Sequence, residues 1–315
     1  MHVVIADPIH EVGVKRLESA GFEVRDATDL SGEQLDTAIS KADALIVRSA
    51  TEVTAARIAE APSLKVIARA GIGVDNIDLS TATSAGVQVV NAPTGGVDAV
   101  TEHTFAMAYA LVRALPWTDQ QTKSGKWPKS TYDGGELIDC TFGVVGFGRI
   151  GRSVAERAIQ LGIKVLVTDP HIRGNALEEI GATKVALEEC AKRADILSIH
   201  TPLTEDTSGM IDERILNLLE GGYLINVSRG GIVDEEALVS ALEREQLAGA
   251  GIDVFEDEPL EAAHPLTTCE RILLTPHIAG TSDRAQRTIS ESVADQIIAV
   301  NNDEPVVHPV NNPTG

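Results

Sequence analysis

The sequence predicts an α/β protein built from two doubly wound parallel-sheet domains. Short apolar runs rich in Val and Ile alternate with amphipathic helical stretches over nearly the whole chain. These runs are continuously apolar, as expected when helices cover both faces of a parallel sheet. A glycine-rich turn at residues 146–151 joins one such run to a helical stretch. The chain has 315 residues, which is enough for two domains of ordinary size.

The first third of the chain is predicted to form a small five-stranded sheet. A cluster of helix breakers follows at residues 91–96, and a long helical stretch then extends from about Asp98 to Leu115. We therefore place a domain crossing after residue 96. The predicted strands are residues 2–6, 22–25, 44–47, 65–68 and 87–90.

A second series of strands begins at Thr141, and its six members suit a dinucleotide-binding sheet. They are residues 141–145, 163–168, 195–199, 223–227, 249–252 and 272–275. A last helix is predicted at residues 285–300, before an extended tail at 304–310. If that helix packs back on the first sheet, residues 1–96 and 286–315 form a smaller, flavodoxin-like, substrate-binding domain. Residues 97–285 then form a Rossmann domain, with the active cleft between the two.

The segment from Trp117 to Gly135 is predicted to be irregular. It contains Trp117, Trp127 and Tyr132, although only 3% of the chain is aromatic. Aromatic side chains grouped on a loop suggest a subunit contact, and hence a homodimer. Packing of these side chains against the chain's own core is the alternative, and the sequence does not choose between the two.

Composition excludes several classes of function. The net charge of −21 argues against a nucleic-acid or anionic-membrane surface, because such a field repels phosphates. No apolar run is long enough to span a membrane, and residues 1–7 resemble a strand rather than a targeting segment. We therefore expect a cytoplasmic protein. Cys140, Cys190 and Cys269 are widely separated and show no metal or redox spacing, so reduced structural thiols and no metal site are expected.

The turn Gly146-Phe-Gly148-Arg-Ile-Gly151 has the strand-turn-helix context of a dinucleotide site. Gly146 permits the tight turn, Gly148 lets the backbone approach a pyrophosphate, and Gly151 lets helix and strand pack closely. The phosphates then meet the positive end of a helix. Asp169 ends the next strand, where its carboxylate can bind the adenosine ribose and repel a 2′-phosphate. NAD is therefore favoured over NADP.

Ligands of an open parallel sheet bind outside the carboxyl ends of its strands. Read in chain order, the residues at those ends and in the intervening turn are Thr201, Pro202, Ser228, Arg229, Asp253, Glu258 and His277. One edge of the sheet thus gathers a guanidinium, carboxylates and an imidazole.

These groups suit the reduction of a 2-keto acid. Arg229 can grip the substrate carboxylate through a bidentate fork, and His277 can supply a proton near neutral pH. Glu258 is the candidate partner that stabilises the protonated imidazole. Each residue alone also has a structural interpretation, as a buried histidine, a salt-bridge arginine or a turn-capping glutamate. The placement of all three residues at one edge of the sheet favours a catalytic site. His103 and His200 are interpreted as structural.

The chain resembles the D-isomer-specific 2-hydroxyacid dehydrogenases, through motifs that span nearly its full length. The matching segments are Ile46–Thr51, Arg69–Asn76, Val144–Gly151, His200–Pro202, Asn226–Glu235, Ala250–Phe255 and Thr275–Gly280. The resemblance implies that His277 is the acid/base, Glu258 its partner and Arg229 the binder of substrate carboxylate and carbonyl. It also implies a dimer joined through residues 98–140.

The resemblance assigns further contacts to both ligands. Arg149 and Ile150 would contact the pyrophosphate of NAD, and Asp169 its ribose. The residues implied on the nicotinamide side are Thr201, Val227, Asp253 and Gly280. Pro202 and Ser228, at the same strand ends, are further candidate cofactor contacts. The loop Gly71-Ile72-Gly73 would offer backbone N–H groups to the substrate carboxylate.

Arg48 and Arg69 match positions that help bind the phosphate end of the substrate in the phosphoglycerate-oxidising members, and the neighbouring Ser49 is a further candidate substrate contact. The resemblance therefore favours 3-phosphoglycerate and the first step of serine biosynthesis. Glyoxylate, hydroxypyruvate and branched 2-keto acids remain alternatives, and Arg48 could instead bridge the domains. Formate dehydrogenases of this family pair the histidine with glutamine, so Glu258 argues against formate. An alternative of another class is an NAD-sensing corepressor-like binding protein.

Overall fold

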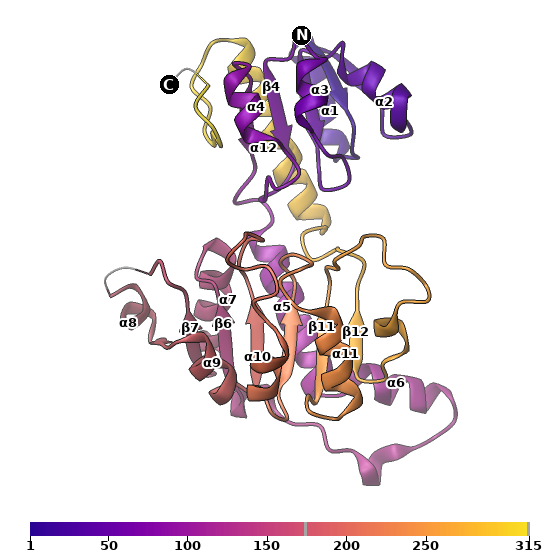
Figure 1. The fold of residues 1–315 in the computed structure, drawn as a ribbon, viewed down its shortest axis with the longest axis vertical. Helices are drawn as coiled ribbons and strands as arrows, with labels where there is room; N and C mark the ends of the chain where they lie inside the picture. Colours follow the sequence, from indigo (N-terminus) through magenta and orange to yellow (C-terminus); the bar gives the residue numbers. More distant parts are fainter. Residues whose placement is uncertain (173–174, 314–315) are drawn as a thin grey trace. The chain divides into compact units, whose positions relative to one another are not determined.

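The computed structural model describes residues 1–172 and 175–313. It divides into two compact units (Figure 1), which we call the first unit (Met1–Val97 with Gly280–Gly315) and the second unit (Asp98–Ala279). The later division falls six residues before the predicted boundary at 285/286. The reason is that the last helix starts at Asp283, with the Ser282 side chain accepting from the Ala285 N–H, so its first turn belongs with the rest of the helix.

The first unit contains a five-stranded, all-parallel sheet of order β2-β1-β3-β4-β5, the flavodoxin-like order. Its strands are β1 (His2–Ile5), β2 (Glu23–Asp26), β3 (Ala44–Val47), β4 (Val66–Arg69) and β5 (Gln88–Asn91). Strands β3 and β4 are buried along their whole length, which explains why β3 is apolar throughout and β4 is apolar up to its last residue, Arg69. The helices are α1 (Glu11–Ser19), α2 (Gly32–Ile39), α3 (Ala55–Ala59), α4 (Leu79–Ser84) and α12 (Asp283–Asn301).

Helix α12 returns the end of the chain to this unit. It packs along α1 and against β4 and β5. Contact is close because Gly13 of α1 has no side chain: an added Cβ would lie 2.8 Å from the carbonyl oxygen of Ser290. The tail after α12 pairs with β5 through an antiparallel bridge between Val90 and Pro309.

The second unit contains a seven-stranded, all-parallel sheet of order β12-β11-β10-β9-β6-β7-β8. This is the Rossmann order with one strand added at the edge. Its strands are β6 (Thr141–Val145), β7 (Lys164–Thr168), β8 (Thr183–Lys184), β9 (Ile196–Ile199), β10 (Tyr223–Asn226), β11 (Gly249–Ile252) and β12 (Ile272–Leu274). Strand β8 was not predicted from the sequence, because its two residues are polar and exposed and leave no apolar pattern.

Ten further elements in the described part of this unit are helical. The α-helices are α5 (Val97–Val112), α6 (Leu115–Lys123), α7 (Arg149–Gln160), α8 (Ala176–Ile180), α9 (Leu187–Arg193), α10 (Glu213–Leu218) and α11 (Glu235–Glu243); short 3₁₀ turns lie at Pro128–Thr131, Leu137–Asp139 and Pro265–Thr268. The prediction of one helix to Leu115 followed by an irregular segment was wrong. Ala114 adopts a left-handed conformation (φ 47°), which ends α5, and Pro116 lies in the first turn of α6.

Helix α5 lies close against strand β11 because two residues of that strand are glycines. A Cβ on Gly251 would lie 3.0 Å from Met107 Sδ, and one on Gly249 would lie 3.5 Å from Leu111 Cδ2. The helix therefore passes along the strand with one face against it. This contact fixes the N-terminal half of α5 relative to the carboxyl ends of β11 and β12.

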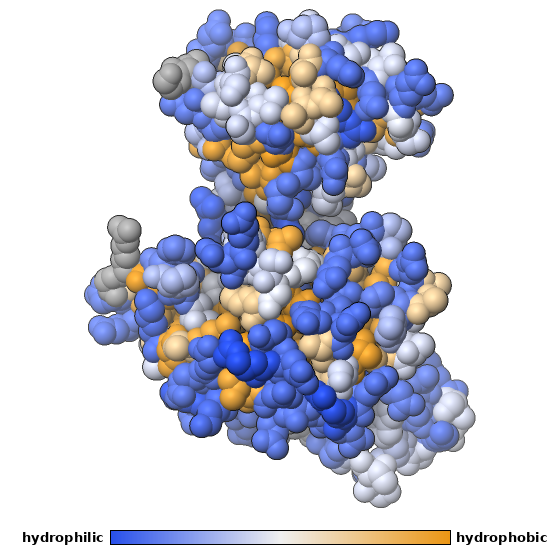
Figure 2. Space-filling model, in the orientation of Figure 1, coloured by the Kyte–Doolittle hydropathy of each residue, from blue (hydrophilic) through white to orange (hydrophobic). Residues whose placement is uncertain are grey.

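The visible faces of both units are largely hydrophilic, in keeping with the net charge of −21 (Figure 2). Within the described residues, none of the helices is long and apolar enough to cross a membrane. The three thiols are free, and burial raises the pKa of Cys140 to about 11 and that of Cys190 to about 12. Neither of these two thiols is therefore ionised near neutral pH.

Candidate active site

The turn after β6 places three glycines where side chains would obstruct the backbone or a ligand. Gly146 has φ +92°, and an added Cβ would lie 2.6 Å from the carbonyl oxygen of His200. A Cβ on Gly151 would collide with the Gly146 carbonyl oxygen. Gly148 instead faces open space, with no atom within 4 Å of an added Cβ. The turn thus leaves room beside Gly148, where helix α7 begins with the exposed Arg149 and the half-buried Ile150.

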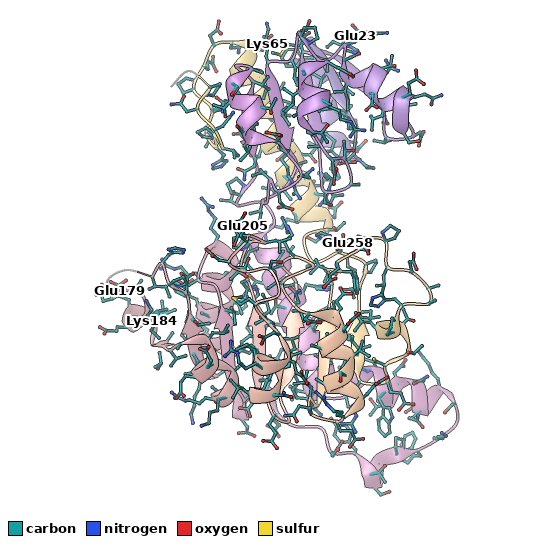
Figure 3. All side chains as sticks on the ribbon, in the orientation of Figure 1. Glu23, Lys65, Glu179, Lys184, Glu205 and Glu258 are labelled. Carbon is teal, nitrogen blue, oxygen red and sulfur yellow. The ribbon has the colours of Figure 1, made fainter. Side chains whose placement is uncertain are left out.

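Asp169, directly after β7, holds this turn from the neighbouring strand. Its Oδ2 accepts a hydrogen bond from the Phe147 N–H at 2.7 Å, and its Oδ1 accepts one from the His171 N–H at 2.7 Å. The carboxylate also borders a hollow of about 480 Å³ at the ends of β7 and β8. The lining residues are Thr168, Asp169, Pro170, Lys184, Val185 and Ala186, and Figure 3 labels Lys184 there.

Two loops at the same edge bring an imidazole and a carboxylate together. His277 Nδ1 lies 2.7 Å from Glu258 Oε2, and both side chains are about one-third exposed. Glu258 Oε1 also accepts a hydrogen bond from the Phe255 N–H at 3.1 Å. Figure 3 shows Glu258 on the loop after β11 at the same edge of the sheet as Glu205, which lies on the loop after β9.

The surroundings of Glu258 keep it ionised. Burial alone would raise its pKa, but the hydrogen bond and charge of His277 outweigh this effect, together with the Phe255 N–H and the charge of Arg229. The net result is a pKa below the usual 4.5. A carboxylate bonded to Nδ1 fixes the imidazole with Nε2 directed elsewhere, which is the arrangement of an oriented acid/base.

Arg229 follows β10 on a short loop that Asn226 organises. The buried Asn226 donates from Nδ2 to the Arg229 carbonyl oxygen at 2.9 Å and accepts at Oδ1 from the Ser228 N–H (3.1 Å) and hydroxyl (3.0 Å). Arg229 Nη1 donates to the Ser228 carbonyl oxygen at 2.7 Å. Because Arg229 contributes to the pKa of Glu258, its guanidinium acts on the same cluster as His277. This role of Asn226 was not predicted from the sequence.

Asp253, after β11, is completely buried and ties the His277 loop to the sheet. Its Oδ1 accepts from the Ile278 N–H and its Oδ2 from the Ala279 N–H, each at 2.9 Å. Its backbone carbonyl accepts from the His277 N–H at 2.7 Å. The carboxylate that the sequence places at the strand end therefore faces inward, where it fixes the backbone of the two residues that follow His277.

The loop after β9 contributes buried polar atoms beside the glycine turn. His200 is half-buried, its Nε2 is 2.8 Å from Ser198 Oγ, and burial lowers its pKa to about 3, so it stays neutral. His200 Nδ1 and Thr201 Oγ1 have no hydrogen-bond partner within the described part of the chain. A buried hydroxyl without a partner at a sheet's switch point is suited to a bound ligand.

The other expected contacts are at the ends of strands in both units. Pro202 is exposed, Val227 is buried, and Gly280 begins the C-terminal segment of the first unit. In the first unit, Arg48 and the exposed Ser49 follow β3, while the buried Arg69 and the loop Gly71-Ile72-Gly73 follow the adjacent β4. Two cations thus lie at neighbouring strand ends.

Hydrogen bonds within the first unit shape these two loops. Asp7 accepts from the backbone N–H of Arg48 at 2.6 Å, and Asn76 Nδ2 donates to the Arg48 carbonyl oxygen at 2.7 Å. Burial lowers the pKa of Arg48 and the charge of Asp7 opposes this effect. A Cβ on Gly71 would collide with the Arg69 guanidinium, so glycine lets that side chain lie over the loop.

Comparison with known proteins identifies the family. Residues 105–279 match the family model described as "D-isomer specific 2-hydroxyacid dehydrogenase, NAD binding domain". The chain belongs to the D-isomer specific 2-hydroxyacid dehydrogenase family. It is 38% identical over 315 residues to D-3-phosphoglycerate dehydrogenase of Archaeoglobus fulgidus, covering 100% of this chain and 60% of that protein. The chain thus spans about three fifths of the length of the curated relatives it matches.

Solved structures of the family share the fold but differ in their named substrates. D-lactate dehydrogenase from Aquifex aeolicus, complexed with NAD and lactic acid, matches with a TM-score of 0.89 and 29% identity, covering 100% of both chains. NAD-dependent formate dehydrogenase from Staphylococcus aureus, in complex with NAD, matches with a TM-score of 0.86 and 31% identity, covering 97% of both chains. The fold alone therefore does not select a substrate.

The second unit is an NAD-binding domain, and its residues fit that cofactor. The open space beside Gly148, the start of α7 and the buried Thr201 hydroxyl lie along the switch point between β6 and β9. No group of three or more His, Cys, Asp or Glu residues suited to a metal ion occurs in the part of the chain that the structure describes.

Proposed function

We propose that this chain is an NAD-dependent D-2-hydroxyacid dehydrogenase whose substrate is D-3-phosphoglycerate. The observation that supports it best is the 2.7 Å contact between His277 and the ionised Glu258, with the charge of Arg229 acting on the same carboxylate. Such a cluster provides a proton-transfer group and a carboxylate-binding cation in one place. The reaction would be the first step of serine biosynthesis, in the cytoplasm.

Each residue of the cluster has a separate task in this proposal. Arg229 binds the substrate carboxylate and polarises the carbonyl, since its planar fork matches a carboxylate. His277 exchanges a proton with the substrate oxygen through Nε2, and Glu258 fixes the ring and stabilises its charged form. Bound NAD supplies the hydride acceptor. Asn226 and Asp253 hold the loops that present Arg229 and His277.

The cofactor contacts follow from the same edge of the sheet. We assign the pyrophosphate to Gly146, Gly148, Gly151, Arg149 and Ile150 at the start of α7. Asp169 takes the adenosine ribose, beside the hollow at the ends of β7 and β8. On the nicotinamide side we assign Thr201, Pro202, Val227, Ser228, Asp253 and Gly280.

The substrate's phosphate end is assigned to the first unit. Arg48 and Arg69 follow adjacent strands, and the protein's net charge of −21 makes such local cations necessary for capturing an anion. We also assign Ser49 to the phosphate end and the loop Gly71-Ile72-Gly73 to the carboxylate. The relatives named D-3-phosphoglycerate dehydrogenase, at 38–40% identity, support this choice.

We further propose that the chain forms a homodimer through the segment around α6. Large apolar side chains are exposed over this segment, which leaves the layered part of the second unit in Figure 1; Trp127 is the most exposed, at 79%. The others are Tyr109, Leu115, Trp117, Tyr132 and Ile138. Patches of this kind are typical of subunit contacts.

A panel of substrates tests the proposal. Initial rates with NADH and 3-phosphohydroxypyruvate, glyoxylate, hydroxypyruvate, pyruvate or a branched 2-keto acid give kcat/KM for each, and we expect the highest value for 3-phosphohydroxypyruvate. A higher value for glyoxylate or hydroxypyruvate would reassign the substrate. Tight NADH binding without turnover of any of these acids would instead favour an NAD-sensing binding protein. Formate with NAD is the control, and we expect no rate because Glu258 occupies the position beside His277.

A further inference from the structure

The loop that holds His277 has an unusual backbone. His277 is in the left-handed region, at φ +52°, where a residue with a Cβ is disfavoured. Its N–H donates to the carbonyl oxygens of Asp253 (2.7 Å) and Thr275 (3.0 Å). The next two N–H groups, of Ile278 and Ala279, donate to the Asp253 carboxylate. The conformation of the loop therefore depends on how firmly Asp253 is held.

A series of hydrogen bonds connects helix α5 to Asp253. Thr275 Oγ1 lies 2.5 Å from Asp253 Oδ1 and 3.1 Å from His103 Nε2. The single hydroxyl proton of Thr275 is donated to Asp253 Oδ1. The hydroxyl oxygen then accepts from His103, which requires the proton on Nε2 of that imidazole. His103 Nε2 is also 3.6 Å from Asp253 Oδ1, and thus brings a donor close to a carboxylate that has no contact with water.

The packing of α5 explains why His103 reaches this position. Residues 103, 107 and 111 share one face of the helix. Leu111 lies against Gly249 and Met107 against Gly251, so the next residue of that face meets the end of β11 at Asp253. Four residues of helix rise about 6 Å and two residues of strand about 6.6 Å, so the two registers match.

We propose that His103 is a positioning residue: through Thr275 and Asp253 it holds the loop that presents the His277 imidazole. This inference rests on the proposed function, since it concerns the same acid/base. It assigns a role to a histidine that touches neither His277 nor Glu258 in the hydrogen bonds described above. The His103 donor keeps the Thr275 hydroxyl directed at Asp253, and the carboxylate keeps the N–H groups of Ile278 and Ala279, which follow His277, in place.

Substitutions at position 103 separate this role from a general packing role. His103→Leu removes the donor and keeps an apolar side chain of similar size, whereas His103→Gln keeps an N–H at nearly the same reach. We expect His103→Leu to lower kcat about tenfold, as for other losses of orienting hydrogen bonds. KM for the 2-keto acid and Kd for NADH should stay within about twofold. His103→Gln should restore most of kcat. Glu102→Gln, at the exposed adjacent position of the same helix, is the matched control and should change none of these values.

A double variant tests whether the chain of contacts acts as one unit. Thr275→Val removes the hydroxyl between His103 and Asp253. If both side chains act through the same bond, His103→Leu combined with Thr275→Val lowers kcat no further than the worse single variant. If the two substitutions instead lowered kcat by factors that multiply in the double variant, His103 would not act through Thr275, and the proposed positioning role would be wrong.

A measurement without substrate keeps the inference testable if the proposed activity is absent. Amide hydrogen exchange of the full chain, followed by mass spectrometry, reports protection of residues 276–280. We expect faster exchange there in His103→Leu and recovery in His103→Gln. Wild-type protein that turns over no 2-keto acid but shows this pattern would remove the proposed function and leave the positioning role. Equal exchange and equal kcat in wild type and His103→Leu would overturn the positioning role, as would failure of His103→Gln to recover either value.

Discussion

The turn after β6 and the loop after β12 lie at the same edge of the second sheet, but they are built by different means. The first takes its shape from its own glycines, because Gly146 and Gly151 leave no space for a Cβ. The second contains a non-glycine residue in the left-handed region at His277. It is held by groups far away in the sequence, Asp253 and Glu258.

This difference matches what each loop would have to bind. A pyrophosphate is bound by backbone N–H groups and a helix dipole, so absence of side chains is the main requirement. An acid/base needs one imidazole in one orientation, which only side-chain hydrogen bonds can provide. Substitutions should therefore have local, steric effects at the first loop and long-range, orientational effects at the second.

The largest expected effect is at the second loop. His277→Ala should lower kcat by about two to four orders of magnitude, a usual contribution of general acid-base catalysis, and leave the NADH dissociation constant nearly unchanged. Stopped-flow or steady-state rates together with NADH fluorescence titration measure both quantities. His308→Ala, in the C-terminal tail, is the control, because the hydrogen bonds of His308 described here are made by its backbone. Near-normal turnover of His277→Ala would remove the acid/base from this loop.

At the first loop, two alanine substitutions should affect different properties: one should lower stability and the other should weaken NADH binding. Gly146→Ala places a Cβ 2.6 Å from the His200 carbonyl at positive φ, so the free energy of unfolding should fall by about 1–2 kcal/mol or more. Tm should then fall by several degrees. Gly148→Ala fills open space and should leave Tm unchanged while weakening NADH binding about tenfold or more.

Calorimetry and NADH titration of the two alanine variants distinguish the two roles. If Gly148→Ala bound NADH as tightly as wild type, the cofactor would not approach this turn. The statement that the glycines of this loop make room for a pyrophosphate would then be wrong.

The same contrast explains what the sequence could predict. The glycine turn, Asp169 and eleven of the twelve strands in the described residues lie within one residue of their predicted positions, because local patterns determine them. The strand-end rule also placed Arg229, Asp253 and His277 at one edge. The roles of Asn226, Thr275 and His103 were not predicted. Thr275 and His103 bond to residues that are distant in the sequence, and no sequence pattern reveals how the Asn226 side chain is oriented. Ala114 was missed because no propensity rule signals a left-handed alanine.

Asp169 combines the two kinds of loop structure. Its side chain holds the glycine turn by accepting a hydrogen bond from the Phe147 N–H. Asp169→Asn keeps an oxygen acceptor for that N–H and removes the charge that would repel a 2′-phosphate. We expect the ratio of kcat/KM for NADPH to that for NADH to rise about tenfold, equivalent to about 1.4 kcal/mol. Asp169→Ala, which also loses the tie to the turn, should in addition weaken both cofactors. An unchanged ratio in both variants would count against a ribose contact.

The smallest expected effect concerns the pH dependence of stability at the second loop. The pKa of Glu258 lies below its usual 4.5 in the folded protein. Burial raises this pKa, but His277, the Phe255 N–H and Arg229 together lower it by more. Its ionised form therefore stabilises the fold above that pH, and the contribution is lost as pH falls through the lower, folded-state pKa. The Tm difference between wild type and Glu258→Gln should shrink as pH falls below 4.5. Because both side chains are one-third exposed, the difference should amount to a few degrees at most. A difference that grew on acidification would mean that Glu258 is held in its neutral form, and the carboxylate could then not stabilise a protonated His277.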